Sequence, residues 1–333
     1  MPPATRRHVV LDRFGGPEAM RWADGPMPRP GAGEVLVAVD AIGVNFADTM
    51  VRRGEYRRDQ PLGFTPGFEV AGHVIGGEGA GAPVVVFCED GGGYADHVVA
   101  RADRVFGILD GVAPHEAVAL FTQGTTAWYA LHRHGRVAPG ETVLVHAAAG
   151  GLGAMTTMLA VHHGARVIAT ASTEAKLQVA REHGAYEAIL ADPGTLTTAV
   201  RERTGGRGAD VVVDGVGGDL FAPSLRALAF NGRYVVAGSA SQAPATLDVR
   251  ALMPRGQTIA GVLVARVAEQ DPDEPRAAFD AVQRLYRDGA IAPRITYVDD
   301  LAQAHRLIES RASAGKLVLR LDLTGRSVSS RGE

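Results

Sequence analysis

The sequence predicts an α/β protein of two domains, in which a doubly wound parallel sheet follows a β-rich domain. A length of 333 residues favours two domains. Short apolar runs separated by glycine and proline clusters fill the first third of the chain. From Glu141 onward, apolar strand-length runs alternate with helix-length segments. This alternation implies a parallel sheet that is covered on both faces.

The first part of the chain has the pattern of a small barrel or sandwich. Gly and Pro cluster at Pro28–Gly33 and Gly76–Pro83, and Gly91–Gly93 suggests a flexible loop. The expected strands between these breaks are Val35–Asp40, Glu69–Ile75, Val84–Cys88 and Tyr94–Val99. Helical spacing then begins around Ala117–His132.

The second part of the chain carries the parallel-sheet pattern. The expected strands are Val143–His146, Arg166–Thr170, Asp210–Asp214, Arg233–Ala237 and Thr258–Val264. The expected helices are Leu152–His163, Glu174–His183 with Gly184 as C-cap, and Leu220–Phe230. The tail reads as helix Pro275–Asp288, strand Arg294–Val298, helix Leu301–Ser310 and strand Lys316–Leu321. The pattern alone leaves open whether this tail extends the parallel sheet or returns to the first domain.

Composition excludes several classes of function. A formal net charge of -3 gives no electrostatic reason to expect nucleic acid or an anionic membrane as partner. The single cysteine, Cys88, can form neither an intrachain disulfide nor a multi-cysteine metal site. The chain shows no signal peptide and no apolar run long enough to cross a bilayer, so we expect a cytoplasmic protein.

A glycine-rich loop follows the expected strand Val143–His146 and precedes a helix. Aligned with the pattern G-x-G-x-x-G, it has Ala148 at the first glycine, then Gly150 and Gly153. Gly150 would let the backbone approach a pyrophosphate, and Gly153 would let the helix pack closely on the strand. The N–H groups at the start of the helix would face the phosphates. The predicted dinucleotide loop of this Rossmann domain is Ala148, Gly150, Gly151, Leu152 and Gly153.

The next expected strand indicates which dinucleotide is bound. An NAD enzyme usually has an acidic residue at the end of this strand, but here the strand is followed by Ser172 and Thr173. Ser172 and Lys176 could donate to a 2′-phosphate, which a carboxylate would repel. The sequence therefore favours NADPH. Two alternatives stay open, because Glu174 is close enough to bind the ribose and Lys176 could be a solvated surface lysine.

Five segments in order carry a resemblance to a known family. They are Gly43–Thr49, Arg53–Tyr56, Pro66–Gly72, His146–Gly153, and Glu309–Arg311 followed by Gly315–Leu319. They cover nearly the whole chain, which resembles the medium-chain dehydrogenases/reductases in their zinc-independent, zeta-crystallin-like quinone oxidoreductase branch.

The resemblance implies a domain arrangement and a set of site residues. A GroES-like substrate domain would comprise residues 1–124 and 265–333, and the Rossmann domain residues 125–264, with the cofactor in the cleft between them. The resemblance also implies a homodimer formed by pairing of sheet edges at Thr258–Val264. Implied to line the nicotinamide or to contact the cofactor are Asn45, Thr126, Gly238, Ser239, Val262, Leu263, Val264 and, at its phosphate, Arg311.

The chain departs from the pattern of this family at informative positions. Zinc-dependent relatives have a cysteine where this chain has Asn45 and a His-Glu pair where it has Phe68 and Glu69, and their four-cysteine lobe is absent here. We therefore expect no metal site. A tyrosine that holds the 2′-phosphate in some relatives is also missing, and Asp192 stands near its place.

Without a Lewis acid, oxidation of an alcohol is disfavoured, and reduction of an acceptor that takes hydride readily is favoured. Such acceptors are quinones, enones and enoyl thioesters. Tyr56 matches a tyrosine proposed as the proton donor in related enoyl reductases, although a packing or stacking role is equally compatible with the sequence. Asn45 could donate a hydrogen bond to the acceptor's carbonyl oxygen. Alternatives are an enone reductase of secondary metabolism, a non-reductive enzyme and an NADPH-sensing protein.

Overall fold

The computed structural model describes residues 4–56 and 61–322. The chain divides into two compact units. Unit 1 holds the described residues up to Thr122, then Ala268–Gln283, then the described residues from Ile295 onward. Unit 2 holds Gln123–Val267 and Arg284–Arg294.

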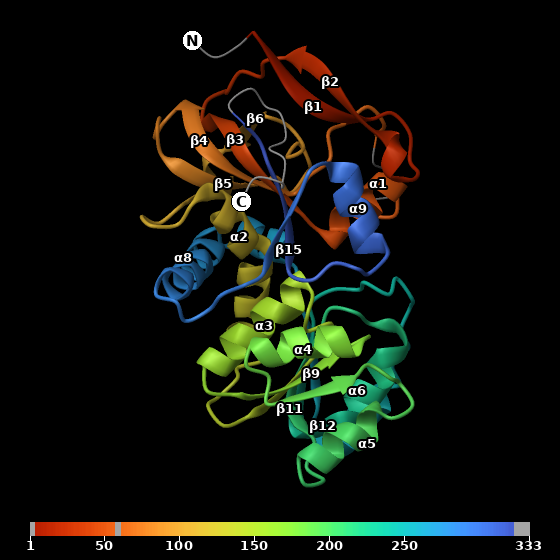
Figure 1. The fold of residues 1–333 in the computed structure, drawn as a ribbon. Coiled ribbons are helices and arrows are strands. Elements are labelled where there is room, and N and C mark those ends of the chain that lie inside the picture. The colour runs from red at the N-terminus through yellow and green to blue at the C-terminus, as the bar shows by residue number, and fades with distance from the viewer. Residues whose placement is uncertain (1–3, 57–60, 323–333) are drawn as a thin grey trace. The chain divides into compact units, whose positions relative to one another are not determined.

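Unit 1 is built on β structure. A seven-stranded sheet has the order β14-β15-β3-β4-β5-β7, with β6 also paired to β3. A separate hairpin joins β1 and β2 (Figure 1). The strands are β1 (Thr5–Leu11), β2 (Met20–Pro26), β3 (Glu34–Val44), β4 (Glu69–Gly76), β5 (Pro83–Phe87), β6 (His97–Arg101), β7 (Val105–Gly107), β14 (Ile295–Val298) and β15 (Lys316–Arg320). Because β15 pairs antiparallel with β3, the end of the chain returns to the first sheet. This settles the question that the sequence pattern left open.

The helices of unit 1 are α1 (Phe46–Arg53), α2 (Pro114–Trp128, whose last residues belong to unit 2), α8 (Asp273–Arg287, likewise shared) and α9 (Leu301–Glu309). Helix α1 is absent from the sequence prediction because it has only two turns. It begins where Asp48 accepts a hydrogen bond from the N–H of Asn45, 2.7 Å away, at the helix N-terminus. Val37, Ile42, Val70, Val86 and Leu319 are among the buried residues of the core. The buried side chains of β3 thus anchor the residues that follow it.

Unit 2 contains a six-stranded parallel sheet in the order β10-β9-β8-β11-β12-β13. Its strands are β8 (Thr142–Val145), β9 (Arg166–Ala171), β10 (Glu187–Leu190), β11 (Ala209–Asp214), β12 (Leu228–Val236) and β13 (Thr258–Gly261). The strands run outward in chain order on both sides of the boundary between β8 and β11, as in a doubly wound sheet. The predicted doubly wound α/β class is confirmed, and the sequence interpretation had left out β10.

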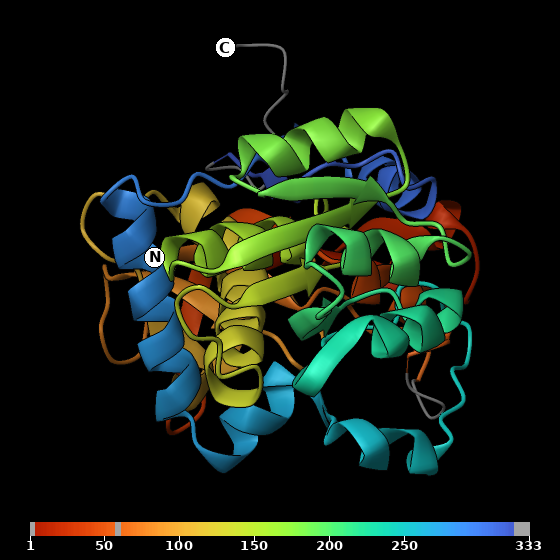
Figure 2. The same cartoon turned by 90° about the horizontal axis from the view of Figure 1, so that it is seen from below.

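Helices cover both faces of this sheet (Figure 2). They are α3 (Gly151–His162), α4 (Glu174–Glu182), α5 (Leu196–Arg203) and α6 (Phe221–Ala227), and α7 (Val264–Gln270) follows β13. Right-handed crossovers on the two sides of the boundary between β8 and β11 place α3 and α4 on one face and α5 and α6 on the other. Gly184 has φ +89° just beyond α4, so it is the predicted C-terminal glycine.

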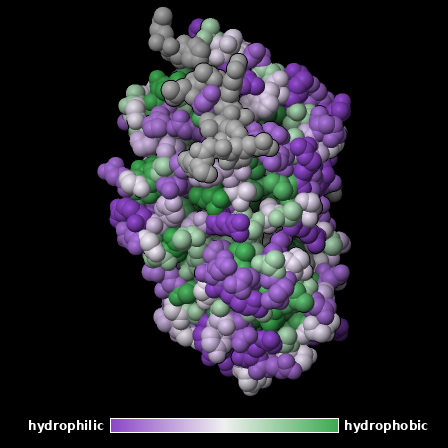
Figure 3. All heavy atoms as spheres, viewed as in Figure 1, coloured by the Kyte–Doolittle hydropathy of each residue, from purple (hydrophilic) through white to green (hydrophobic). Residues whose placement is uncertain are grey.

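No helix within the described residues is long and apolar enough to cross a membrane. On the face drawn in Figure 3, hydrophilic residues are interspersed with smaller hydrophobic patches.

Candidate functional site

The glycine-rich loop of unit 2 joins β8 to α3, as the sequence predicts. Gly150 is the N-cap of α3, and the helix starts at Gly151, one residue before the expected Leu152. The first helical hydrogen bond runs from Ala154 N to Gly150 O, 2.8 Å. The N–H groups of Gly151, Leu152 and Gly153 therefore precede the helical ladder, which is the arrangement that binds a phosphate.

Gly153 has no room for a side chain. A Cβ at this position would lie 2.3 Å from the carbonyl oxygen of Ala147, a backbone atom that cannot rotate away. Ala148 is fully buried under the loop, with its N–H bonded to Thr170 O at 2.9 Å. The loop therefore requires glycine at its last position and tolerates alanine at its first.

The remaining cofactor residues expected in unit 2 follow other strands of the same parallel sheet. Ser172 and Lys176 follow β9, Gly238 and Ser239 follow β12, and Val262 and Val264 follow β13. Because all six strands are parallel, these segments lie at the same edge of the sheet as the glycine-rich loop. Thr126 lies near the end of α2, also in unit 2.

Two carboxylates, those of Glu174 and Asp192, would repel a 2′-phosphate, but each accepts hydrogen bonds from neighbouring residues. Glu174 Oε1 accepts from Arg181 Nη1 at 2.7 Å along the exposed side of α4. Asp192 accepts from Gly194 N at 3.0 Å and from Thr195 Oγ1 at 2.8 Å, and these hydrogen bonds lower the pKa of its carboxyl. Both acids thus have local cation or hydrogen-bond partners.

In unit 1, Asn45 lies at the junction of β3 and α1 and is 6% exposed. Its Nδ2 donates to Glu69 Oε1 at 2.9 Å, and its Oδ1 accepts from Lys316 Nζ at 2.7 Å. Lys316 Nζ also forms an ion pair with Glu69 Oε1. The three side chains form a closed triangle that is almost completely buried.

The second oxygen of the Glu69 carboxylate, Oε2, accepts hydrogen bonds from a residue of α2. Thr122 donates to Glu69 Oε2 from its hydroxyl at 2.6 Å and from its backbone N–H at 3.1 Å. Gly43 makes space for the carboxylate, because a Cβ there would lie 2.7 Å from Glu69 Cγ. Every oxygen of this buried carboxylate therefore has at least one donor, as burial of a charge requires.

Lys316 and Thr122 are functional candidates that the sequence interpretation missed. One signal was available: the sequence contains two lysines, Lys176 and Lys316, among 34 basic residues. A lysine at the start of an otherwise apolar strand, in a chain that otherwise uses arginine, indicates a need for a compact ammonium.

A second buried chain of polar groups lies next to Asn45. The Asp48 carboxyl is fully buried and interacts electrostatically with Tyr94, whose hydroxyl oxygen is 2.9 Å from His305 Nε2. Burial is the main cause that raises the pKa of Asp48 to about 7, and burial likewise lowers the pKa of His305 to about 3. At neutral pH His305 is uncharged.

Tyr56 lies edge-on to Phe68, with ring centroids 5.1 Å apart. The two rings line a small cavity of about 10 Å³ in unit 1, which is about the space of one water molecule. Its other lining residues are Val51, Phe64, Gly67, Glu89, Asp90 and Gly91. The cavity thus combines aromatic walls with carboxylates on one side.

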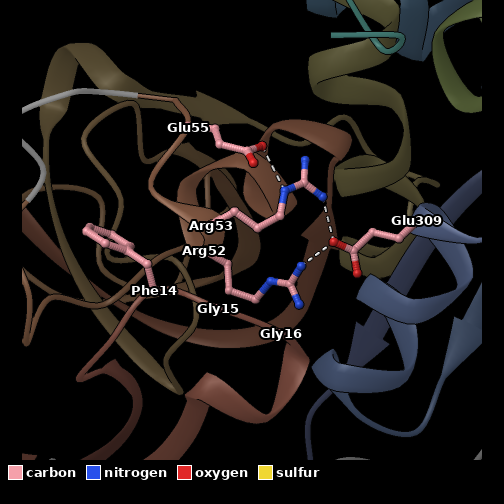
Figure 4. Close-up of a pocket in the computed structure, with 7 residues that line it drawn as sticks. All are labelled: Phe14, Gly15, Gly16, Arg52, Arg53, Glu55 and Glu309. Atoms are coloured by element: carbon pink, nitrogen blue, oxygen red, sulfur yellow. Dashed lines mark hydrogen bonds and ion pairs between the residues drawn. The ribbon is translucent and has the colours of Figure 1, made fainter.

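Arg311 adopts φ +56° just after the end of α9, a conformation that a non-glycine residue rarely takes. Two residues earlier, Glu309 forms ion pairs with Arg52 and Arg53 from α1, the second at 2.6 Å. These groups line a pocket of about 410 Å³ together with Phe14, Gly15, Gly16 and Glu55 (Figure 4). Two arginines face two glutamates here, so the lining carries no net charge that would attract an anion. The ion pairs fix the end of α9 against α1.

Two family models match the chain. Residues 31–139 match the alcohol dehydrogenase GroES-like domain, and residues 151–284 match the zinc-binding dehydrogenase model. The chain is 33% identical to quinone oxidoreductase-like protein 2 of Rattus norvegicus over 307 residues, covering 88% of this chain and 87% of the relative. It is 30% identical to the quinone oxidoreductase of Mus musculus, covering 95% and 98% of the two chains.

Solved structures agree. The Escherichia coli quinone oxidoreductase complexed with NADPH superimposes with a TM-score of 0.85 at 29% identity, over 95% of this chain and all of that one. A mycobacterial protein complexed with NADPH gives 0.88 at 33% identity, over 95% and 99%. These matches confirm the GroES-like and Rossmann assignment of the two folds. The chain belongs to the medium-chain dehydrogenase/reductase superfamily, in its quinone oxidoreductase-like branch.

Proposed function

We propose that this protein is an NADPH-dependent reductase that reduces a quinone or another activated acceptor without zinc. Membership of the quinone oxidoreductase-like branch and its similarity to NADPH-complexed structures support the oxidoreductase assignment. The observation that carries the zinc-free chemistry is the Lys316 ammonium bound between Asn45 and Glu69.

The residues present do not fit a catalytic zinc, although one matching family model is called zinc-binding. The Lys316 ammonium donates to Asn45 Oδ1 and Glu69 Oε1, and Thr122 donates to Glu69 Oε2, so each oxygen that these two residues could offer to a metal already has a donor. Phe68, where zinc-dependent relatives have histidine, supplies no donor atom. Zinc prefers nitrogen and sulfur donors, and an ammonium at this distance would repel a dication.

The residues of unit 2 fit a dinucleotide. The Gly153 position allows close backbone approach, and the first N–H groups of α3 would hold the pyrophosphate. Ser172 and Lys176 would hold the 2′-phosphate, since the two nearby acids are already engaged. NADPH, when bound, supplies the hydride. We further infer that Thr126, Gly238, Ser239, Val262, Val264 and Arg311 contact the cofactor.

Asn45 and Tyr56 would act on the acceptor. Addition of one hydride to a quinone or enone leaves one negative charge on the acceptor's oxygen, and one proton completes the product. Asn45 Nδ2 donates a hydrogen bond to that oxygen, and Tyr56 gives the proton. Tyr56, Phe64 and Phe68 put aromatic rings around a cavity that must widen to admit an acceptor, and such rings favour a planar, unsaturated acceptor over a flexible aliphatic one.

The decisive experiment follows nicotinamide absorbance with NADPH or NADH and a panel of quinones and enones, with and without chelator. Fast, chelator-insensitive NADPH oxidation by one acceptor class supports the proposal and names the class, quinone or enone. No oxidation despite tight NADPH binding points instead to a specialised or non-reductive role. Full turnover by both Asn45→Ala and Tyr56→Phe would refute the roles given to these residues.

We also propose that the protein is a cytoplasmic homodimer. Strand β13 is the last strand at one side of the six-stranded sheet, and the adjacent Leu263 is 53% exposed. A second copy pairing along β13 would extend the sheet and cover this side chain. Analytical ultracentrifugation tests this, because a mass near 34.8 kDa would show a monomer.

A further inference from the structure

The buried triangle of Asn45, Glu69 and Lys316 assigns a direction to the Asn45 amide. Its oxygen meets an ammonium, and its nitrogen meets a carboxylate. If the amide flipped, its N–H groups would face the ammonium and its oxygen would face the carboxylate. Both contacts would be repulsive inside a site with little water to screen them. The two charges therefore favour one of two orientations that are otherwise almost equal in shape, and the Asp48 N–H of the capping box, which donates to the Asn45 side chain, adds to that preference.

The backbone brings these residues together by strand pairing rather than by sequence proximity. Strand β15 pairs with β3 so that Leu317 lies opposite Val44, which sets the neighbouring Lys316 beside Asn45. Glu69 begins β4, opposite Gly43 on the other side of β3. Asn45 thus has one charged partner from β15 and one from β4, which both pair with β3. The barrel-like pairing around β3 fixes both charges on rigid elements.

The kind of cation at position 316 matters as well as its charge. Lys316 is 3% exposed and is one of two lysines in a chain with 32 arginines. An ammonium donates to Asn45 and Glu69 from a single point, whereas a guanidinium is a planar fork that needs more room and more acceptors. The composition and the geometry both indicate that a compact point donor is required here.

We propose that Lys316 and Glu69 are positioning residues, which hold the nitrogen end of the Asn45 amide as the donor for the acceptor's oxygen. This rests on the proposed reductase function. Neither residue needs to touch the acceptor. The pair is neutral as a whole, so its contribution is orientation rather than net positive charge.

The test uses Lys316→Met, Glu69→Gln and the double variant. Each single change leaves one buried charge without its partner, so both kcat and the melting temperature should fall. The double variant has no unpaired charge, so its melting temperature should recover. Its kcat should stay about 100-fold below wild type with KM for NADPH unchanged, because the amide is no longer oriented. Recovery of kcat together with the melting temperature would show a merely structural pair and overturn the proposal.

Two further variants test the kind of cation and the effect of losing an ion pair elsewhere: Lys316→Arg and Arg233→Met. Lys316→Arg keeps the positive charge but replaces the compact ammonium with a planar guanidinium, so its kcat should be lower than that of the wild type. Arg233→Met removes a half-buried ion pair with Glu141 in unit 2 and should lower stability without lowering kcat. Wild-type turnover by Lys316→Arg would contradict the requirement for a compact cation.

A measurement on the amide itself does not depend on turnover. In proton–nitrogen-15 spectra, the side-chain amide signals of Asn45 are identified as those that disappear in Asn45→Ala. We expect two well-separated, slowly exchanging hydrogens in wild type, and fast-exchanging ones in the double variant. Should no acceptor be reduced, the proposed function fails while this result still reports on orientation. Identical exchange in wild type and double variant would overturn the positioning role.

Discussion

The two candidate sites of this molecule are built in opposite ways. In unit 2, the site is mainly backbone, contributed by a loop of consecutive residues between β8 and α3. In unit 1, it is mainly side chains, and Asn45, Glu69, Thr122 and Lys316 come from four separate elements. A backbone site depends on the absence of side chains, whereas the side-chain site depends on matched charges buried together.

This difference determines how each site fails. The backbone site tolerates changes of polarity but not of volume, because its N–H groups exist at any residue. The side-chain site tolerates little change of charge, because each buried charge has one partner. Substitutions in the two units should therefore differ in both magnitude and pH dependence.

The largest effect is expected from added volume in the backbone site. Gly153→Val would press its side chain against the backbone of Ala147, where a Cβ already lies 2.3 Å from the carbonyl oxygen. We expect a loss of about 4 kcal/mol in the free energy of unfolding, or an unfolded protein. Gly107→Ala is the control, because nothing lies within 4 Å of a Cβ there. Equal melting temperatures for the two variants would contradict the close packing of this loop.

The second largest effect is expected at a buried charge in unit 1. Because the pKa of Asp48 is raised from 3.8 to about 7, its contribution to stability is complete below pH 3.8 and is lost as pH rises through about 7. Asp48→Asn keeps an oxygen for the N–H of Asn45 and cannot ionise. Relative to wild type, this variant should become more stable by about 3 kcal/mol between pH 4 and pH 8. Chemical denaturation across that range measures the difference.

Asp192→Asn provides a control of opposite sign. The hydrogen bonds of Asp192 lower its pKa, so its stabilisation is present above pH 3.8 and is lost as pH falls through its folded pKa. Any change in Asp192→Asn should therefore be destabilising at neutral pH. A pH-independent difference between Asp48→Asn and wild type would disprove the raised pKa.

The same contrast explains which parts could be predicted from the sequence. The glycine-rich loop was predictable because its residues are consecutive and its strand and helix adjoin it. Asn45 was found only through family resemblance, since nothing local distinguishes it from a helix cap. The partners Thr122 and Lys316 were missed because strand pairing and packing across more than 50 residues of sequence bring Thr122 to Glu69 and Lys316 to Asn45 and Glu69.

Two differences between the expected and the observed secondary structure also have physical causes. Helix α1 was missed because Phe46–Arg53 is too short for its periodicity to stand out. Strand β6 begins at His97 rather than at Tyr94, because the backbone just before it bonds to β1: Tyr94 O accepts from Val9 N at 2.8 Å and Asp96 N donates to Arg7 O at 2.9 Å. Backbone pairing with β1 therefore displaced the start of the expected strand.

A smaller effect is expected from the one charged side chain assigned to the cofactor in unit 2. Lys176→Ala should weaken NADPH binding by about 1–3 kcal/mol and leave NADH binding nearly unchanged, because only NADPH carries the 2′-phosphate. Glu174→Gln is the control, since Glu174 is paired with Arg181 and should not contribute to either affinity. Fluorescence titration measures both cofactors. Equal losses for NADPH and NADH would exclude the assignment of Lys176.

The smallest effect is expected from the hydroxyl of Tyr56, and it depends on the acceptor. Tyr56→Phe keeps the edge contact with Phe68, so the cavity should retain its shape. An enolate is a strong base that needs its proton in the site, so enone reduction should slow by about 10-fold, or ~1.4 kcal/mol. A hydroquinone anion is weakly basic and can take its proton from water, so quinone reduction should hardly change. Comparing kcat of this variant with both acceptors therefore tests the proton donor, and an equal loss for both would assign Tyr56 to stacking instead.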